Sequence, residues 1–134
     1  MKIGIYGGSF NPVHKGHVSL AKNILQMNIV DELWFVVSPR NPLKEKNSLM
    51  HDSIRLTKVR EAVAGISGAR VSDIEFHLPK PSYMYLTLSE IQKQHPNDTI
   101  FLIIGADNWL CFDEWKKHEE ILNKYNILIY PRPG

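Results

Sequence analysis

Two histidines at the end of a glycine-containing segment are the residues of this sequence best suited to chemistry. His14 and His17 lie three positions apart, directly after the run GGSFNPV at residues 7–13. Glycines let backbone N–H groups approach a ligand closely, and the free amides and positive dipole end of a following helix favour an anion such as phosphate. His17 also lies in line with the apolar stripe predicted for the next helix, so both imidazoles should face the strand ends. The spacing therefore predicts an anion site with two imidazole donors.

Simpler interpretations of the same segment stay open. A glycine pair can serve packing alone, and two histidines at this spacing can be surface residues or metal ligands, although no third ligand is adjacent in sequence. The dinucleotide-binding fingerprint is excluded because the glycines do not give G-x-G-x-x-G, and the second predicted strand ends without an acidic residue. The Walker phosphate loop is excluded because no G-K-[ST] follows.

The elements that must position these residues are short apolar strands alternating with amphipathic helices. Strands are predicted at residues 2–6, 33–37, 100–104 and 127–130, with a weaker one at 70–76, and helices at 16–27, 52–66, 83–94 and 114–125. This alternation predicts an α/β fold, an open parallel sheet with helices on both faces. A ligand should bind at the carboxyl ends of the strands, where residues 7–17, 38–48, 77–82 and 105–115 follow.

Composition limits the class of protein. The 134 residues fit one domain spanning 1–134, and a net charge of +2 is too small for holding nucleic acid by bulk electrostatics. The single cysteine, Cys111, favours a reducing and hence cytoplasmic compartment. No signal peptide or membrane-spanning segment is expected.

The segment GGSFNPVHKGH resembles the G-G-[ST]-F-[DN]-P-x-H-x-G-H signature of the nucleotidyltransferase superfamily, which has a Rossmann-like fold. Other segments resemble those of one group within it, the bacterial nicotinate-nucleotide adenylyltransferases. They are NPLK at residues 41–44, DIEF at 73–76, PSY at 81–83, TL at 87–88, GAD at 105–107 and RPG at 132–134.

The resemblance implies adenylyl transfer from ATP to nicotinate mononucleotide, giving deamido-NAD and pyrophosphate. Mg²⁺ would arrive with ATP and have no protein ligand. The implied catalytic residues are His14 and His17. The implied ATP-binding residues are Gly7, Gly8, Ser9, Phe10, Gly16, Lys44, Gly105 and Asp107. The implied nicotinate-nucleotide-binding residues are Ser82, Tyr83, Thr87, Trp109, Trp115 and Arg132.

Several of these residues have a structural interpretation as well. Lys44 could meet triphosphate oxygens or be a solvated lysine, and Asp107 could bind a ribose or cap the next helix. Trp115 lies on a predicted apolar stripe, where core packing competes with stacking on a pyridine ring, and Trp109 could do either. Ser82 is most simply a helix cap and Thr87 a helix-surface residue. Arg55 lies beside the apolar stripe of its helix, as an ion-pair partner or a nucleotide ligand.

The sequence departs from the family pattern in three places. Trp115-Lys116 stands where the family usually has Trp-Tyr, and Ser82-Tyr83-Met84 where it has Ser-Tyr-Thr. The chain also ends at Gly134, before the family's [IS]-S-[ST]-x-x-R motif, which predicts a C-terminally truncated chain or a degenerate homologue.

Three other functions remain to be distinguished. They are nucleotidyl transfer to another phosphorylated acceptor, nucleotide binding without turnover, and a flavodoxin-like electron carrier, which would leave the histidine pair unexplained. The oligomeric state is open, a homo-oligomer being one of the states allowed.

Overall fold

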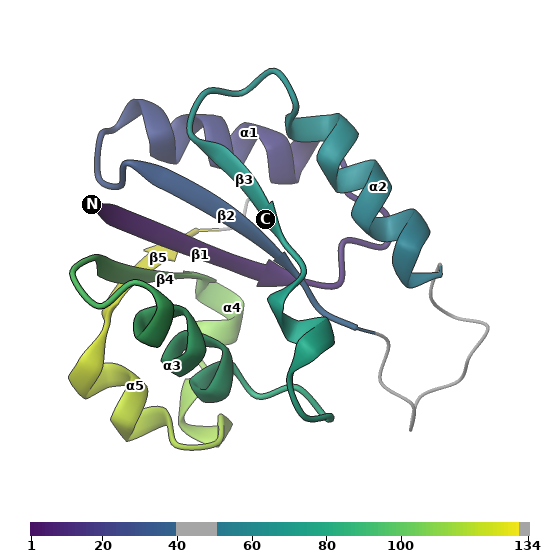
Figure 1. Ribbon diagram of the computed structural model, residues 1–134. Helices are drawn as coiled ribbons and strands as arrows, with labels where there is room; N and C mark the ends of the chain where they lie inside the picture. Colours follow the sequence, from purple (N-terminus) through teal and green to yellow (C-terminus); the bar gives the residue numbers. More distant parts are fainter. Residues whose placement is uncertain (40–50, 132–134) are drawn as a thin grey trace.

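The computed structural model describes residues 1–39 and 51–131, which form a five-stranded parallel sheet. Its strands are β1 (Lys2–Gly8), β2 (Glu32–Val37), β3 (Ala69–Ser72), β4 (Thr99–Gly105) and β5 (Asn126–Tyr130). They lie in the order β3-β2-β1-β4-β5, so the order reverses between β1 and β4 (Figure 1). The predicted open parallel α/β sheet is confirmed, and its crevice for ligands is expected at that reversal.

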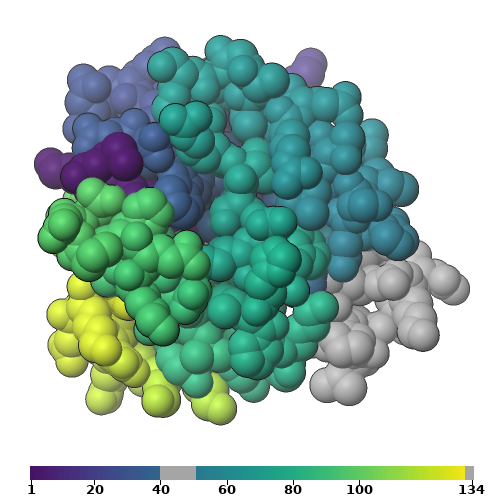
Figure 2. All heavy atoms as spheres, in the orientation of Figure 1, coloured from purple at the N-terminus to yellow at the C-terminus, as the bar shows by residue number. Residues whose placement is uncertain are grey.

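Helices cover both faces of the sheet. Helices α1 (Lys15–Gln26) and α2 (Asp52–Val63) pack on one face, and α3 (Met84–Gln94) and α5 (His118–Lys124) on the other (Figure 1). The short helices are η1 (Ile74–His77), α4 (Ala106–Trp109) and η2 (Phe112–Glu114). In the space-filling view, the helices and the connecting segments together cover most of the sheet (Figure 2). Within residues 1–39 and 51–131, no helix has the length and apolar character needed to cross a membrane.

The central strands are apolar almost throughout because both of their faces are buried. In β1, Ile3 and Ile5 pack toward α3 and α5, whereas Tyr6 packs toward α1 and α2. In β2, Phe35 and Val36 likewise face opposite layers, and both are fully buried. Successive side chains of a strand point to opposite faces, so a strand between two helical layers needs apolar residues at nearly every position.

The strand predicted at 70–76 is wrong in its second half. Strand β3 ends at Ser72, whose Oγ accepts a hydrogen bond from the Ile74 N–H at 3.2 Å. The chain then forms the 3₁₀ helix η1, in which Glu75 is buried. A serine side chain that takes up a nearby backbone amide competes with the strand ladder, so the chain turns here at the sheet edge.

The single helix predicted at 114–125 is also wrong. Helix α5 begins only at His118, because Lys117 adopts a left-handed conformation with φ of 56° and Trp115 is extended. Trp115 therefore lies in the connection between η2 and α5, not on a helical stripe.

Two expectations about α3 fail as well. Tyr83, not Ser82, occupies the N-cap position, and it makes no side-chain capping bond. Thr87 is 1% exposed and is not a helix-surface residue. The threonine hydroxyl can be buried because it donates a hydrogen bond to Glu75, as described below.

Candidate active site

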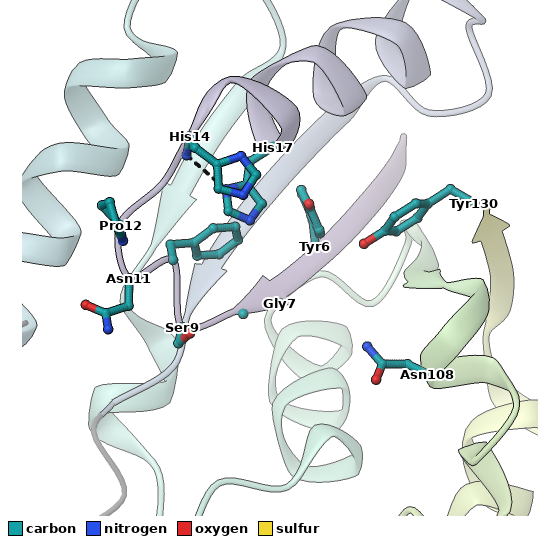
Figure 3. Close-up of a pocket in the computed structure, with 11 residues that line it drawn as sticks. Tyr6, Gly7, Ser9, Asn11, Pro12, His14, His17, Asn108 and Tyr130 are labelled. Carbon is teal, nitrogen blue, oxygen red and sulfur yellow. Dashed lines mark hydrogen bonds between the residues drawn. The ribbon is translucent and has the colours of Figure 1, made fainter. Parts of the chain in front are cut away.

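The predicted loop lines a pocket of 310 Å³ at the carboxyl ends of the strands. Its walls come from the end of β1, the loop to α1 and the first turn of that helix, with Asn108 and Tyr130 opposite (Figure 3). The lining residues are Tyr6, Gly7, Gly8, Ser9, Phe10, Asn11, Pro12, His14, His17, Asn108 and Tyr130. We call this the histidine pocket. It lies beside the reversal in strand order, where open α/β sheets bind ligands.

The side chain of His14 caps the N-terminus of α1, and the side chain of His17 in turn binds the backbone of His14. His14 is the N-cap residue, and its Nδ1 accepts the Gly16 N–H at 3.1 Å. The Nδ1 of His17 accepts the His14 N–H at 3.0 Å (Figure 3), and the rings stack with centroids 3.8 Å apart. Since Nδ1 is the acceptor in both rings, the proton of each neutral imidazole lies on Nε2. Each ring therefore carries its N–H donor at Nε2, on the side away from its cap.

The aromatic core of the sheet supports His17. Phe10 is 3% exposed, and its ring meets His17 edge-on with centroids 5.0 Å apart. Tyr6 lies behind both rings, 5.5 Å from Phe10 and 6.1 Å from His17 between centroids. Phe10 adopts a φ of 48°, which is unusual for a residue with a side chain and persists only where the surroundings determine it. The loop conformation thus buries the Phe10 ring against His17, the candidate catalytic residue.

The glycine between the histidines leaves room for the His14 ring. A Cβ on Gly16 would lie 2.9 Å from Cε1 and 3.1 Å from Nδ1 of His14. Both distances are shorter than ordinary van der Waals contacts, so a side chain at position 16 would displace the imidazole.

We expect Gly16→Ala to lower kcat about tenfold, because the displaced His14 ring loses both its capping bond and its stacking on His17. Steady-state kinetics check this, and Gly65→Ala is a matched control, since a Cβ there meets nothing within 4 Å. Wild-type kcat in Gly16→Ala would show that the position of the His14 ring is unimportant.

A second pocket of 350 Å³ lies on the α3 side of the same sheet edge. Its lining residues are Ser38, Glu75, Ser82, Tyr83, Met84, Glu114, Trp115 and Lys116, and we call it the tryptophan pocket. A Cβ on Gly7 would lie 2.9 Å from Cε of Met84. The two pockets are therefore neighbours, and the absence of a side chain on Gly7 lets Met84 pack against the strand between them.

Two buried polar atoms of the tryptophan pocket lack protein partners among the described residues. They are Oε1 of Glu75 and Oγ of Ser82. The other carboxylate oxygen of Glu75 accepts a hydrogen bond from the Thr87 hydroxyl at 2.8 Å. A buried polar atom without a partner is costly, so both atoms are suited to hydrogen bonding with a ligand.

Burial raises the pKa of the Glu75 carboxyl above 4.5, and the hydroxyls of Thr87 and Ser38 oppose the rise in part. Between pH 4.5 and this raised pKa, the native state holds a proton that the unfolded state has released. The free energy of unfolding that Glu75 contributes is therefore greatest below pH 4.5 and is lost as pH rises through the folded-state pKa.

We expect Glu75→Gln to remove this pH dependence, because glutamine has no proton to lose. The wild-type curve of unfolding free energy should fall relative to the variant above pH 4.5, by at most about 1.4 kcal/mol per pH unit. Urea denaturation at a series of pH values checks this, with Glu119→Gln, on the exposed surface of α5, as a control. Parallel curves for wild type and Glu75→Gln would contradict the expectation.

The structure brings together many of the residues expected from the sequence. Gly7, Gly8, Ser9, Phe10, His14 and His17 line the histidine pocket. Gly16 joins both histidines in an adjoining hollow of 470 Å³ between α1 and the end of β5. Ser82, Tyr83 and Trp115 line the tryptophan pocket, and Thr87 lies behind it on Glu75.

Other expected site residues are placed differently. Trp109 is 36% exposed on α4 and packs on Phe112, and it lines neither the histidine nor the tryptophan pocket. Gly105 is the N-cap residue of α4, so Asp107 is within its first turn and is not the cap. The expected roles of Gly105 and Asp107 in ATP binding stay predictions. Lys44 and Arg132 lie outside the described residues.

Several residues that line these pockets were not among the expected site residues. Asn108 and Tyr130 reach the histidine pocket from α4 and β5, and Glu75 reaches the tryptophan pocket from η1. Arg55, expected as an ion-pair partner or a nucleotide ligand, pairs with Asp52 and is fully buried, which its place beside the apolar stripe did not predict. The DIEF motif at residues 73–76 contains Glu75 and was the signal for it, whereas no local pattern indicates Asn108 or Tyr130, because their contacts join segments far apart in the sequence.

Comparison with known proteins agrees with this architecture. Residues 5–133 match the cytidylyltransferase-like family. The chain is 47% identical over 133 residues to a "Probable nicotinate-nucleotide adenylyltransferase" of Bacteroides fragilis, covering 99% of this chain and 66% of that protein. It is also 47% identical to a protein of the same printed name from Cytophaga hutchinsonii, covering 99% and 69%. The chain thus spans about two thirds of the length of these relatives.

Solved structures share the fold. A Vibrio parahaemolyticus protein assigned to the nicotinate-nucleotide adenylyltransferases superposes with a TM-score of 0.82 at 28% identity, over 99% of this chain and 75% of that one. The Plasmodium falciparum nicotinic acid mononucleotide adenylyltransferase, complexed with NaAD, gives a TM-score of 0.79 at 22% identity, over 99% and 76%. The chain therefore belongs to the cytidylyltransferase-like family and, within it, to the nicotinate-nucleotide adenylyltransferases.

Proposed function

We propose that this protein transfers the adenylyl group of ATP to nicotinate mononucleotide, giving deamido-NAD and pyrophosphate. The observation that carries the proposal is the stacked pair His14 and His17 over a loop of backbone amides, with a tryptophan-lined pocket next to it. The names of the relatives support the choice of substrates.

The histidine pocket suits the triphosphate of ATP. The 5′-phosphate of the acceptor is ionised at neutral pH, so its attack on the α-phosphorus requires no general base. The protein must align the two substrates and neutralise the charge that grows on the α-phosphoryl group and on pyrophosphate. The Nε2–H groups of His14 and His17 are the proposed donors to those oxygens, and the amides of Gly8, Ser9 and Phe10 form the cradle.

The tryptophan pocket suits the pyridine ring of the acceptor. Trp115 offers an aromatic face, and the unpartnered Oε1 of Glu75 and Oγ of Ser82 offer polar contacts at its wall. Because Gly7 of the histidine pocket and Met84 of the tryptophan pocket are neighbours, an acceptor phosphate at the glycine would lie between its own ring and the triphosphate.

Mg²⁺ enters this proposal as part of the substrate. Within residues 1–39 and 51–131, no group of three or more His, Cys, Asp or Glu side chains could hold a metal ion. The donors that Mg²⁺ prefers are oxygens of phosphate and water, which MgATP carries itself. Both substrates would be taken up from solution, and the cytoplasm stays the predicted compartment because of the single cysteine.

Pyrophosphate release by the full-length protein tests the proposal. We expect release and deamido-NAD with MgATP and nicotinate mononucleotide, and much less product with phosphopantetheine as acceptor or with CTP as donor. Faster turnover with another acceptor would replace the proposed substrate. ATP binding by calorimetry without any product would indicate a nucleotide-binding protein without turnover.

A further inference from the structure

Arg55 is the most deeply buried cation of the described residues, and it contacts walls of both pockets. Its side chain, in the first half of α2, is 0% exposed. The Nη1 group donates hydrogen bonds to the carbonyl oxygens of Ser9 and Ser38, each at 2.7 Å. Ser9 lines the histidine pocket and Ser38 lines the tryptophan pocket. One nitrogen therefore joins the two walls.

A backbone hydrogen bond already joins the end of β1 to the segment that follows β2. The Ser38 N–H donates to the Gly8 carbonyl at 2.9 Å, which continues the pairing of β1 and β2 beyond the sheet. Arg55 adds a second connection, to the carbonyl of Ser9, the next residue after Gly8, and to the carbonyl of Ser38 itself. The second connection restrains the segments beyond the last paired residues of β1 and β2, where the sheet no longer holds them side by side.

The bond to Ser9 also fixes an amide of the phosphate cradle. The Ser9–Phe10 peptide is a planar trans unit, so its carbonyl and the Phe10 N–H point in opposite directions. Holding the Ser9 carbonyl on Arg55 therefore sets the direction of the Phe10 N–H. The same bond helps to hold Phe10 at its φ of 48°, and thereby the ring that supports His17.

Stability alone does not account for a charge at this position. Arg55 forms an ion pair with Asp52, one turn earlier on α2, whose side chain is 34% exposed. Even a paired charge is expensive to bury, and an apolar residue of similar volume is often as stabilising. The planar guanidinium supplies something an apolar residue lacks, several donors in a fixed arrangement that reach two carbonyls and a carboxylate together.

We infer that Arg55 is a positioning residue that sets the distance between the donor phosphates and the acceptor nucleotide by holding Ser9 and Ser38 together. The inference rests on the proposed function of the two pockets. Arg55 touches neither substrate in this account, so its loss should disturb their mutual alignment more than the binding of either one.

Kinetics and binding of Arg55→Met and Arg55→Lys in the full-length protein test this role. Methionine keeps much of the volume and no donor, whereas lysine keeps the charge and one donor group. We expect kcat per active site to fall at least about tenfold in Arg55→Met and less in Arg55→Lys, since small misplacements of reacting groups cost large factors in rate. Dissociation constants for ATP and for nicotinate mononucleotide, each measured alone by calorimetry, should change less than about threefold.

Arg60→Met is the matched control, an exposed arginine on the same helix, and it should retain wild-type kcat. Active-site titration corrects each rate for protein that has not folded. An unchanged kcat in folded Arg55→Met, or a loss that the titration accounts for entirely, would overturn the inference. If Arg55→Met does not fold, the same comparison is made with Arg55→Lys, and wild-type kcat in that variant overturns it.

The inference and the proposed function can fail separately. If the wild-type protein makes no product, the proposed function fails, and the connection itself is tested by the carbonyl ¹³C chemical shifts of Ser9 and Ser38. These are the carbonyls that Arg55 holds, so Arg55→Lys should move their shifts and Arg60→Lys should not. Unmoved shifts would show that Arg55 does not orient the two walls.

Discussion

Replacing His17 by alanine should lower kcat on the order of 100- to 1,000-fold while the KM for ATP changes little. The reason is that its Nε2–H is proposed to donate to oxygens that gain charge only as the α-phosphoryl group is transferred. Removing one such donor typically costs about 3–4 kcal/mol of transition-state stabilisation. Steady-state kinetics with saturating nicotinate mononucleotide provide the measurement.

The control for this prediction must separate chemistry from capping, because the Nδ1 of His17 also accepts the His14 N–H. Asparagine can place its Oδ1 near the position of Nδ1 but has no group in the position of Nε2. His17→Asn should therefore recover thermal stability relative to His17→Ala and still lose kcat. His77→Ala, at a histidine whose side chain is 72% exposed and lines neither pocket, should behave as wild type. Wild-type kcat in either His17 variant would remove this residue from the mechanism.

Replacing Trp115 by alanine should raise the KM for nicotinate mononucleotide roughly 5- to 100-fold and leave the KM for ATP nearly unchanged. Stacking of an aromatic side chain on a base contributes about 1–3 kcal/mol, and Trp115 is the indole that lines the tryptophan pocket. Substrate titrations with each substrate varied in turn distinguish the two pockets.

Trp115 also packs on Phe112, with ring centroids 4.9 Å apart, so truncation could loosen the connection between η2 and α5. Trp115→Phe keeps an aromatic face and most of that packing, and it should recover much of the acceptor affinity. Equal losses for ATP and for the acceptor in Trp115→Ala would mean that the tryptophan supports the fold and does not recognise the pyridine ring.

Much of the site around His14 and His17 was predictable because it is local. The glycines, the histidines and the first helix lie within one stretch of chain, where spacing alone brings the side chains together. The reciprocal capping of the histidines was not predicted. It depends on the backbone conformation at His14, which is extended with φ of −139° and ψ of 179°.

The tryptophan pocket was less predictable because its walls come from separate segments. The sequence predicted that Trp115 lies on a helix. The left-handed conformation of Lys117 instead makes α5 begin at His118, and the indole of Trp115 lines the pocket. Thr87 was placed on the surface because its own helix contains no sign of Glu75, twelve residues earlier. A polar residue is buried only where a partner is brought to it, and η1 supplies that partner.

The sequence by itself determined the parallel α/β fold, the glycine-containing loop and the histidine pair, because strand and helix periodicity and motif spacing are properties of neighbouring residues. Only the tertiary structure decided that β4 lies beside β1, that Asn108 and Tyr130 face the histidines, and that Arg55 joins Ser9 to Ser38. These contacts depend on the order in which the strands pack, which burial of the whole sheet determines and no local pattern records.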